Sequence, residues 1–129
     1  MTKKIFFIDA NVIVHHLLDD HPILSPQAKK LFIQAQSGKI QMYFDEVIVA
    51  EVVWVLKSFY KLPKEDIIKQ LQNIISQPWV VNPRKKLIID SLRQYVATNL
   101  SYIDCWALTV SKNKKIKLET FDKDLQKQV

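Results

Sequence analysis

Short apolar runs alternate along the chain with stretches in which apolar residues recur at helical spacing. The first run, residues 5–8, has four consecutive apolar positions without alternation, which is typical of a strand buried on both faces of a parallel sheet. Comparable runs follow at intervals that leave room for helices. The predicted strands are residues 4–8, 40–44, 78–81 and 115–119.

Helix signals fill the intervals between these strands. Ser25 and Pro26 suit the N-cap and first position of a helix that ends at Gly38, the only glycine. Further candidate N-caps are Asn11, Asp45 and Ser101. Strands that alternate with helices predict βαβ units. We therefore expect a single α/β domain over residues 1–129, with three α/β/α layers around a central, mainly parallel sheet of four to five strands.

The composition limits which binding partners and which cellular compartment are expected. The net charge is +6, and if four of the 13 acids gather in one pocket, the 19 basic residues face nine acids, an excess of ten. Such a surface attracts polyanions such as nucleic acid, although Lys-rich surfaces also serve solubility alone. The single glycine excludes a Gly-rich phosphate loop, and the single cysteine fits a reducing cytoplasm. Neither a signal-peptide core nor a membrane span is present.

Four acidic residues stand out by their position. Asp9 and Asp122 each follow a predicted strand. Glu51 interrupts an apolar helix, and Asp104 lies in the first turn of another helix. Strand C-termini and the first turns of the following helices share one edge of an α/β fold, where ligands bind. We therefore expect the three aspartates to converge there, with the glutamate reaching in from its helix.

Each of these acids also has a purely structural interpretation. Asp9 and Asp122 can cap the helices that follow them, and Asp124 competes with Asp122 for either role. Asp104 can be the third helical residue of a capping box. Glu51 resists such an interpretation best, because a lone carboxylate among nine apolar neighbours loses hydration unless it is paired, for example with a lysine of a neighbouring helix.

Taken together, the four carboxylates require cations. Two carboxylates ~6 Å apart repel by roughly 3 kcal/mol at an effective dielectric constant of 20, and four carboxylates make several such pairs. Ligand sets made only of oxygen atoms favour Mg²⁺ or Mn²⁺, whose open positions bind phosphate oxygens. Such ions activate water and stabilise the leaving oxygen of an in-line displacement. An acidic, metal-binding pocket on a basic exterior is therefore the charge layout of a nuclease.

Three segments carry a resemblance to a known family. Phe-Ile-Asp-Ala-Asn-Val at residues 7–12, Tyr-Ile-Asp-Cys-Trp-Ala-Leu at 102–108 and Glu-Thr-Phe-Asp-Lys-Asp at 119–124 resemble the motifs of a PIN domain. The acids also occur in the order that the family shows, and the resemblance spans nearly the whole chain. The chain is most similar to short, single-domain VapC-type toxins of toxin–antitoxin pairs.

The resemblance implies a Mg²⁺- or Mn²⁺-dependent endoribonuclease that forms a homodimer and is silenced by a small antitoxin in its acidic groove. It further implies that the four acids hold the metal and orient the attacking water. The implied metal ligands are Asp9, Glu51, Asp104 and Asp122, and the implied accessory polar residues are Asn11 and Thr120.

The chain departs from the family pattern at two places. Ala10 stands where the family has Thr or Ser, and the chain ends seven residues after Asp122, where many relatives add an edge strand. Since no predicted ligand is missing, we expect activity.

The first rival function is that of a haloacid-dehalogenase-type phosphotransferase, which needs a second Asp where this chain has Asn11. The second rival is a non-catalytic RNA-binding or regulatory PIN-like module. The third is a housekeeping RNA-processing nuclease, although a single domain favours the stand-alone toxin.

The remaining polar and aromatic residues receive more ordinary interpretations. His15, His16 and His21 do not have a recognised metal-ligand spacing, so a solvated helix end is predicted. The three tryptophans and Cys105 are predicted to pack in the core. The best candidates for contacts with the RNA backbone, with ordinary surface charge as the competing interpretation, are Lys29, Lys30, Arg84, Lys85, Lys86, Lys112, Lys114 and Lys115.

Overall fold

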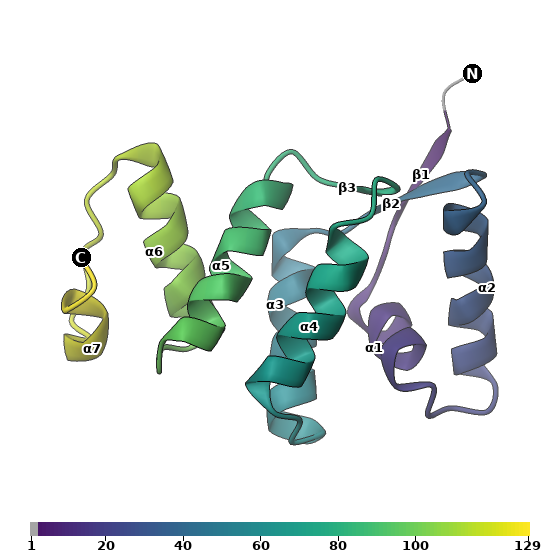
Figure 1. The fold of residues 1–129 in the computed structure, drawn as a ribbon, viewed down its shortest axis with the longest axis horizontal. Helices are drawn as coiled ribbons and strands as arrows, with labels where there is room; N and C mark the ends of the chain where they lie inside the picture. Colours follow the sequence, from purple (N-terminus) through teal and green to yellow (C-terminus); the bar gives the residue numbers. More distant parts are fainter. Residues whose placement is uncertain (1–2) are drawn as a thin grey trace.

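Three short parallel strands and a succession of helices make up residues 3–129, the part of the chain that the computed structural model describes (Figure 1). In chain order the elements are β1 (Lys4–Phe7), α1 (Ala10–Leu18), α2 (Leu24–Gln36), β2 (Ile40–Tyr43), α3 (Glu46–Trp54), the π-helical turn η1 (Val55–Phe59), α4 (Lys64–Ile75), β3 (Val80–Val81), α5 (Lys85–Ala97), α6 (Tyr102–Lys114) and α7 (Lys123–Gln126).

The starts of α3 and α6 are capped as the sequence predicts. The carboxylate of Asp45 accepts a hydrogen bond from the N–H of Val47 at 2.9 Å, and the hydroxyl of Ser101 accepts one from the N–H of Asp104 at 3.2 Å. Each cap satisfies one of the N–H groups that a helix start leaves without a partner.

The other two predicted caps are wrong. Asp9, not Asn11, is the N-cap of α1, because its carboxylate accepts a hydrogen bond from the N–H of Ala10 at 2.9 Å. Helix α2 begins at Leu24, before the predicted Ser25-Pro26 start, and has no side-chain cap. The hydroxyl of Ser25 instead accepts a hydrogen bond from the N–H of His21 at 3.0 Å, so it stabilises the preceding turn.

The inner face of the sheet is the centre of the hydrophobic core. The strand order is β1-β2-β3, and the parallel register aligns Phe6, Met42 and Val80 across the three strands. The ring of Phe32 from α2 covers this face, with its centroid 6.4 Å from that of Phe44. Both crossovers run in the same direction across the sheet, so right-handed connections place their helices on this one face.

The outer face of the sheet is largely uncovered. Ile5 and Phe7 of β1 are 54% and 63% exposed, and the ring of Phe7 stacks on Tyr43 at a centroid distance of 5.8 Å. The prediction that the first strand is buried on both faces is therefore wrong. Burial of this face would require helices from a crossover in the opposite direction, and the helices that follow β3 do not lie over it.

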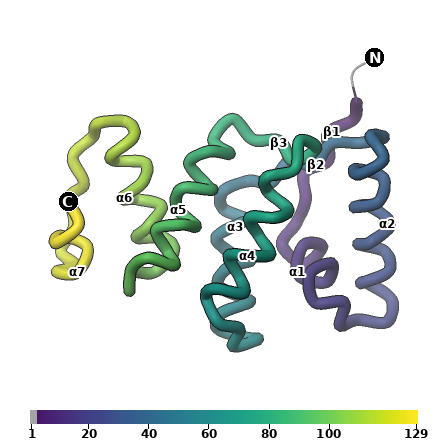
Figure 2. The backbone as a smooth tube through the Cα atoms, viewed as in Figure 1, coloured from purple at the N-terminus to yellow at the C-terminus, as the bar shows by residue number. Residues whose placement is uncertain are grey.

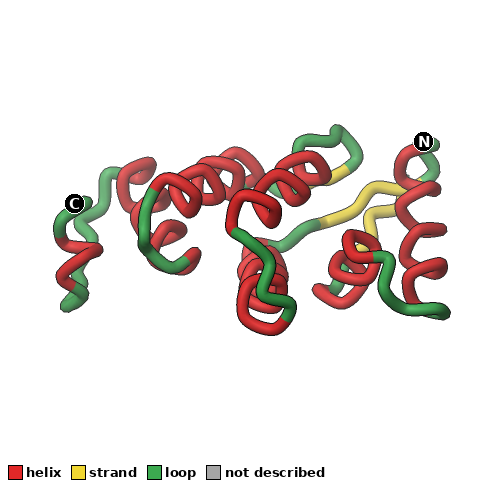
Figure 3. Tube along the Cα trace, turned by 60° about the horizontal axis from the view of Figure 1, so that its bottom comes forward, coloured by secondary structure: helices red, strands yellow, loops and turns green. Residues whose placement is uncertain are grey.

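The C-terminal helices extend away from the sheet. Figures 1 and 3 place α6 and α7 at the opposite end of the long axis from β1, and the tube in Figure 2 runs from α4 through α5 to α6 and α7 in sequence order. Residues 115–119, predicted as a strand, form none here. The parallel α/β class is confirmed, but the described residues contain three strands rather than four to five, and no third layer covers the sheet.

The direction in which the chain leaves the sheet is set by a buried amide. Asn82, only 9% exposed, donates from Nδ2 to the carbonyl oxygen of Phe44 at 2.8 Å and to Glu46 Oε1 at 3.0 Å. Its Oδ1 accepts from the N–H of Arg84 at 2.8 Å. We call residues 3–84 the body and residues 85–129 the arm. The residues just before the arm are therefore tied to Phe44, which follows β2, and to the first turn of α3.

The arm is also attached along the first of its helices. The ammonium group of Lys64 on α4 donates to the carbonyl oxygens of Tyr95 and Thr98 at 3.2 and 2.8 Å. The same nitrogen lies 4.9 Å from the centroid of the Tyr95 ring, a cation–π arrangement. These contacts hold α5 against α4 of the same chain.

Candidate metal and nucleic-acid site

Asp9 lies where the sequence predicts it, two residues after the end of β1 and at the C-terminal edge of the sheet. The residue is exposed, and one of its carboxylate oxygens caps α1. The structural and the functional interpretations of this residue are compatible, because a cap uses one oxygen and a carboxylate has two.

Glu51 does not occupy the environment that the apolar run predicts. It is exposed on α3, and so are Val47 and Trp54, at 71% and 65%. The spacings of four and three residues place these side chains on one face of the helix, while Val49, Val52 and Val53 are buried on the other. Two predictions are therefore wrong: Glu51 keeps its access to water instead of being buried among apolar neighbours, and Trp54 does not pack in the core.

Asp104 and Asp122 both belong to the arm. Asp104 is half-buried in the first turn of α6. Asp122 is exposed and caps α7 by accepting a hydrogen bond from the N–H of Leu125 at 2.9 Å. The hydroxyl of Thr120, a predicted accessory residue, accepts from the N–H of Asp122 at 3.0 Å and so fixes the turn before α7. Asp124 is exposed and lies 3.9 Å from the ammonium of Lys127.

These acids are not gathered within one copy of the chain. Among the described residues, no three His, Cys, Asp or Glu side chains are placed to hold a metal ion. The reason is visible at the level of the fold, since β1 ends just before Asp9, α7 begins just after Asp122, and these two elements lie at opposite ends of the molecule (Figure 1). Four carboxylates are the right kind of donor for Mg²⁺ or Mn²⁺, but a single copy does not bring them together.

The candidate RNA-binding cations fall into two groups. The side chain of Arg84 is paired with Glu46, and the ammonium of Lys85 donates to the carbonyl oxygens of Gln77 and Val80 at 2.7 and 2.9 Å. Burial lowers the pKa of Lys85 below its ordinary value. Both cations therefore already stabilise the junction between body and arm. The exposed candidates are Lys29, Lys30, Lys86, Lys112, Lys114 and Lys115.

The sequence pattern of the PIN domain matches residues 6–129, nearly the whole chain. The chain belongs to the PIN-domain family. PIN domains are generally nucleases, and PIN-domain nucleases typically use divalent metal ions. No curated protein and no solved structure matches the chain. Within the described part of this PIN domain, no helix has the length and apolar content needed to cross a membrane.

The sequence gives no warning of one polar network in this PIN domain. Glu46, in the first turn of α3, accepts hydrogen bonds from the Asn82 amide and from the Arg84 guanidinium. Burial alone raises the pKa of Glu46, but the hydrogen bond from Asn82, its own backbone and the pairing with Arg84 together lower that pKa below its ordinary value. No local sequence pattern indicates this contact, because Asn82 and Glu46 are 36 residues apart in the chain.

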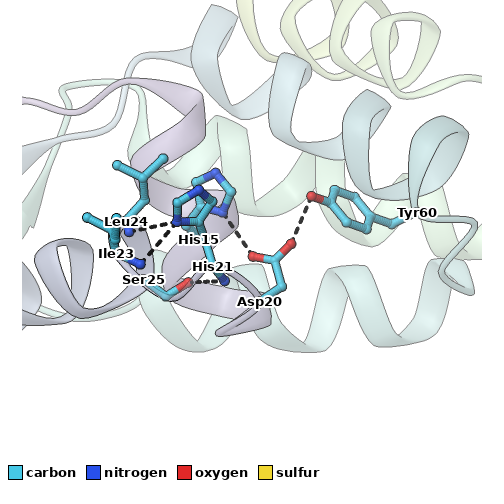
Figure 4. A network of polar contacts seen from close by, with 7 residues as sticks. All are labelled: His15, Asp20, His21, Ile23, Leu24, Ser25 and Tyr60. Carbon is cyan, nitrogen blue, oxygen red and sulfur yellow. Dashed lines mark hydrogen bonds and ion pairs between the residues drawn. The ribbon is translucent and has the colours of Figure 1, made fainter.

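Two histidines of the PIN domain, His15 and His21, stabilise the turn between α1 and α2 (Figure 4). His15 Nδ1 lies 2.9 Å from Asp20 Oδ1, and the hydroxyl of Tyr60 donates to Asp20 Oδ2 at 3.0 Å. These hydrogen bonds, above all the one with His15, lower the pKa of Asp20. His21 Nδ1 accepts from the N–H groups of Ile23 and Leu24 at 3.2 and 2.9 Å.

The burial of His16, Cys105 and two of the tryptophans can be compared with the predictions. The ring of His16 stacks on Phe32 at a centroid distance of 3.7 Å, so it packs on the core instead of lying in solvent. Cys105 is fully buried, and burial raises the pKa of its thiol, which confirms the prediction of a small core residue. Trp79 and Trp106 are half-buried against the core.

Proposed function

We propose that this PIN domain is a Mg²⁺- or Mn²⁺-dependent endoribonuclease and the toxin of a toxin–antitoxin pair. The observation that carries the proposal is the family match over residues 6–129, in a chain whose exposed Asp9 lies two residues after the end of the first strand. The competing functions are a non-catalytic RNA-binding module of the same fold and a housekeeping RNA-processing nuclease.

The proposed active site consists of Asp9, Glu51, Asp104 and Asp122. All four are carboxylates, the donor type that suits Mg²⁺ and Mn²⁺. The first two belong to the body and the other two to the arm. Because a single copy does not gather them, the proposed site requires a body and an arm to come together. Asn11 and Thr120 are proposed accessory residues, and Thr120 already positions Asp122 through its backbone N–H.

The proposed substrate is RNA, and its phosphates are proposed to contact the lysines at the end of α6. Lys112 and Lys114 lie in the last turn of that helix, and both are exposed, as is Lys115. A chain of net charge +6 attracts polyanions, and each phosphate contact releases counterions. Affinity for RNA should therefore fall steeply with salt, and Lys114→Ala should reduce the salt slope by about one unit. A flat salt response would contradict phosphate contacts.

The proposed partners and compartment follow from the similarity to VapC-type toxins. They are a small antitoxin protein and a second copy of the chain in a homodimer, in the cytoplasm. The single cysteine, which is buried and free, is compatible with that reducing compartment.

Cleavage of purified total RNA by wild type and by Asp9→Asn, each with Mg²⁺, with Mn²⁺ and with EDTA, tests the activity. We expect discrete fragments that require metal and disappear in the variant. Asparagine is also a good N-cap, so Asp9→Asn should leave α1 intact. The matched control is Asp66→Asn, which changes an exposed acid in the first turn of α4 and should cleave like wild type. Metal-independent cleavage, or an active Asp9→Asn variant, would refute the assignment.

A further inference from the structure

One edge and one face of the sheet have no partner within the described residues. β1 hydrogen-bonds to β2 alone, so its other edge presents free N–H and C=O groups. The outer face next to that edge exposes Ile5 and Phe7 and continues across Tyr43 into an apolar hollow beside β3. Parallel sheets are normally covered on both faces, and an unpaired edge is a template for another strand.

The arm contains a segment that has the pattern of a strand but pairs with no other strand. Residues 116–121 connect α6 to α7 without helix or strand structure, and apolar and polar positions alternate through Ile116, Lys117, Leu118 and Glu119. Ile116 is 60% exposed and Phe121 is fully exposed. Among the described residues, no backbone hydrogen bond joins 117–121 to another strand. An alternating run of this length has the pattern of a strand, but it has no neighbouring strand to pair with.

The arm also has an apolar stripe that its own chain covers only in part. Ile103 on α6 is 60% exposed, and Trp106 and Val110 at the following helical spacings are half-buried. This stripe is of the kind that packs against a sheet face. The arm therefore offers both a strand for the free edge of β1 and a helix for the outer face beside it.

The junction prevents an arm from reaching the sheet of its own body. The amide of Asn82 is bonded on three sides, and Lys85 is bonded to the carbonyl groups that precede β3 and within it. Lys64 holds the C-terminal end of α5 against α4. Folding back about this junction would break these contacts, whereas a strand from another copy can reach β1 with the junction intact.

We propose that two copies exchange arms, so that residues 116–120 of one copy pair in parallel with β1 of the other and α6 covers its outer face. Parallel pairing places Asp122 of one copy beside Asp9 of the other, since each follows its strand. The order of strands then reverses at β1, and such reversal points are where open α/β sheets bind ligands. This inference rests on the proposed nuclease and makes its active site composite, with two sites per dimer.

Complementation between two inactive variants tests the exchange. Asp9→Asn and Asp122→Asn, each inactive alone, are refolded together from denaturant in equal amounts. Half of the dimers then combine the two variants, and in each of these one site contains both wild-type aspartates. We expect about a quarter of the wild-type cleavage, from the statistics of two-fold dimers. If each site belonged to a single chain, the mixture would stay inactive, and that result would overturn the exchange.

A matched mixture controls for rescue by refolding itself. Asp9→Asn and Glu51→Gln both change the body, so no dimer of these two variants contains an intact site. This mixture should stay inactive, and rescue here would overturn the proposal, as would an Asp122→Asn variant that cleaves RNA on its own.

A second measurement is independent of activity and separates this inference from the nuclease assignment. Unlabelled and ¹⁵N-labelled wild-type protein are refolded together and treated with an amine-reactive cross-linker, and cross-links between Lys4 of β1 and Lys117 of the arm are analysed by mass spectrometry. Exchange predicts cross-links of mixed isotope and a dimer by light scattering. Same-isotope cross-links alone, or a monomer, would overturn the exchange even in an active enzyme, whereas mixed-isotope cross-links in an inactive protein would refute only the nuclease.

Discussion

The body and the arm both consist largely of helices, but only the helices of the body pack on a sheet. In the body, α1 to α4 seal the inner face of the sheet, where Phe32, Phe44 and Met42 are almost wholly buried. In the arm, α5 and α6 pack on each other, and residues 116–121 after them pair with no strand among the described residues. Helices satisfy their backbone groups locally, whereas a strand needs a neighbour. The difference shows that the unfinished part of this fold is its sheet.

The largest effect should come from the core of the body. Phe44→Ala removes a fully buried ring that Phe32 contacts edge-on, and it should cost about 3–5 kcal/mol of unfolding free energy. Leu125→Ala in the short α7 should cost only about 2 kcal/mol, because the surroundings of that four-residue helix can collapse around the change. Urea unfolding of both variants measures the difference. Equal costs would show that the arm is packed as firmly as the body.

The junction between the two regions gives the next largest effect. Asn82→Ala leaves the buried carbonyl oxygen of Phe44 without its donor, and an unsatisfied buried acceptor costs about 1–3 kcal/mol. Hydrogen exchange should rise at the start of α5 more than in α1. Asn73→Ala, an exposed position on α4, is the control and should change stability by less than about 0.5 kcal/mol. A neutral Asn82→Ala variant would contradict the rigid junction.

The helix caps compare one helix of each region. Asp45→Ala at α3 and Ser101→Ala at α6 each remove a side-chain acceptor for a backbone N–H and should each cost about 1 kcal/mol. Similar costs by thermal unfolding would confirm that body and arm helices are finished alike. A Ser101→Ala variant that melts like wild type would show that the start of α6 is already frayed.

The smallest effect should be a dependence of the folding stability on pH. Since the pKa of Glu46 is lower in the folded chain than its ordinary value of 4.5, its ionised form stabilises the fold above that pH. This stabilisation is lost as the pH falls through the lowered pKa. Glu46→Gln should therefore be less stable than wild type at pH 7, and the two should converge in acid. Glu65→Gln, at an exposed position of α4, is the control. Parallel pH curves for Glu46→Gln and wild type would refute the linkage.

Local signals predicted those elements that depend on nearby residues. The caps at Asp45 and Ser101, the three paired strands and the position of Asp9 after the first strand were all visible in the sequence. The predicted environment of Glu51 was wrong because an all-apolar helix does not reveal which of its faces meets the core. The strand at 115–119 was wrong for this conformation because its pattern specifies an extended segment but not its partner.

The sequence by itself determined most of the helices, the parallel βα pattern and the match to the PIN-domain family. These features rest on hydrogen bonds and spacing within short stretches. Only the tertiary structure decided that Asn82 and Glu46 fix the direction of the arm, because this contact joins residues far apart in the chain. The direction in which the arm leaves the sheet also separates Asp9 from Asp122, because Asp9 belongs to the body and Asp122 to the far end of the arm.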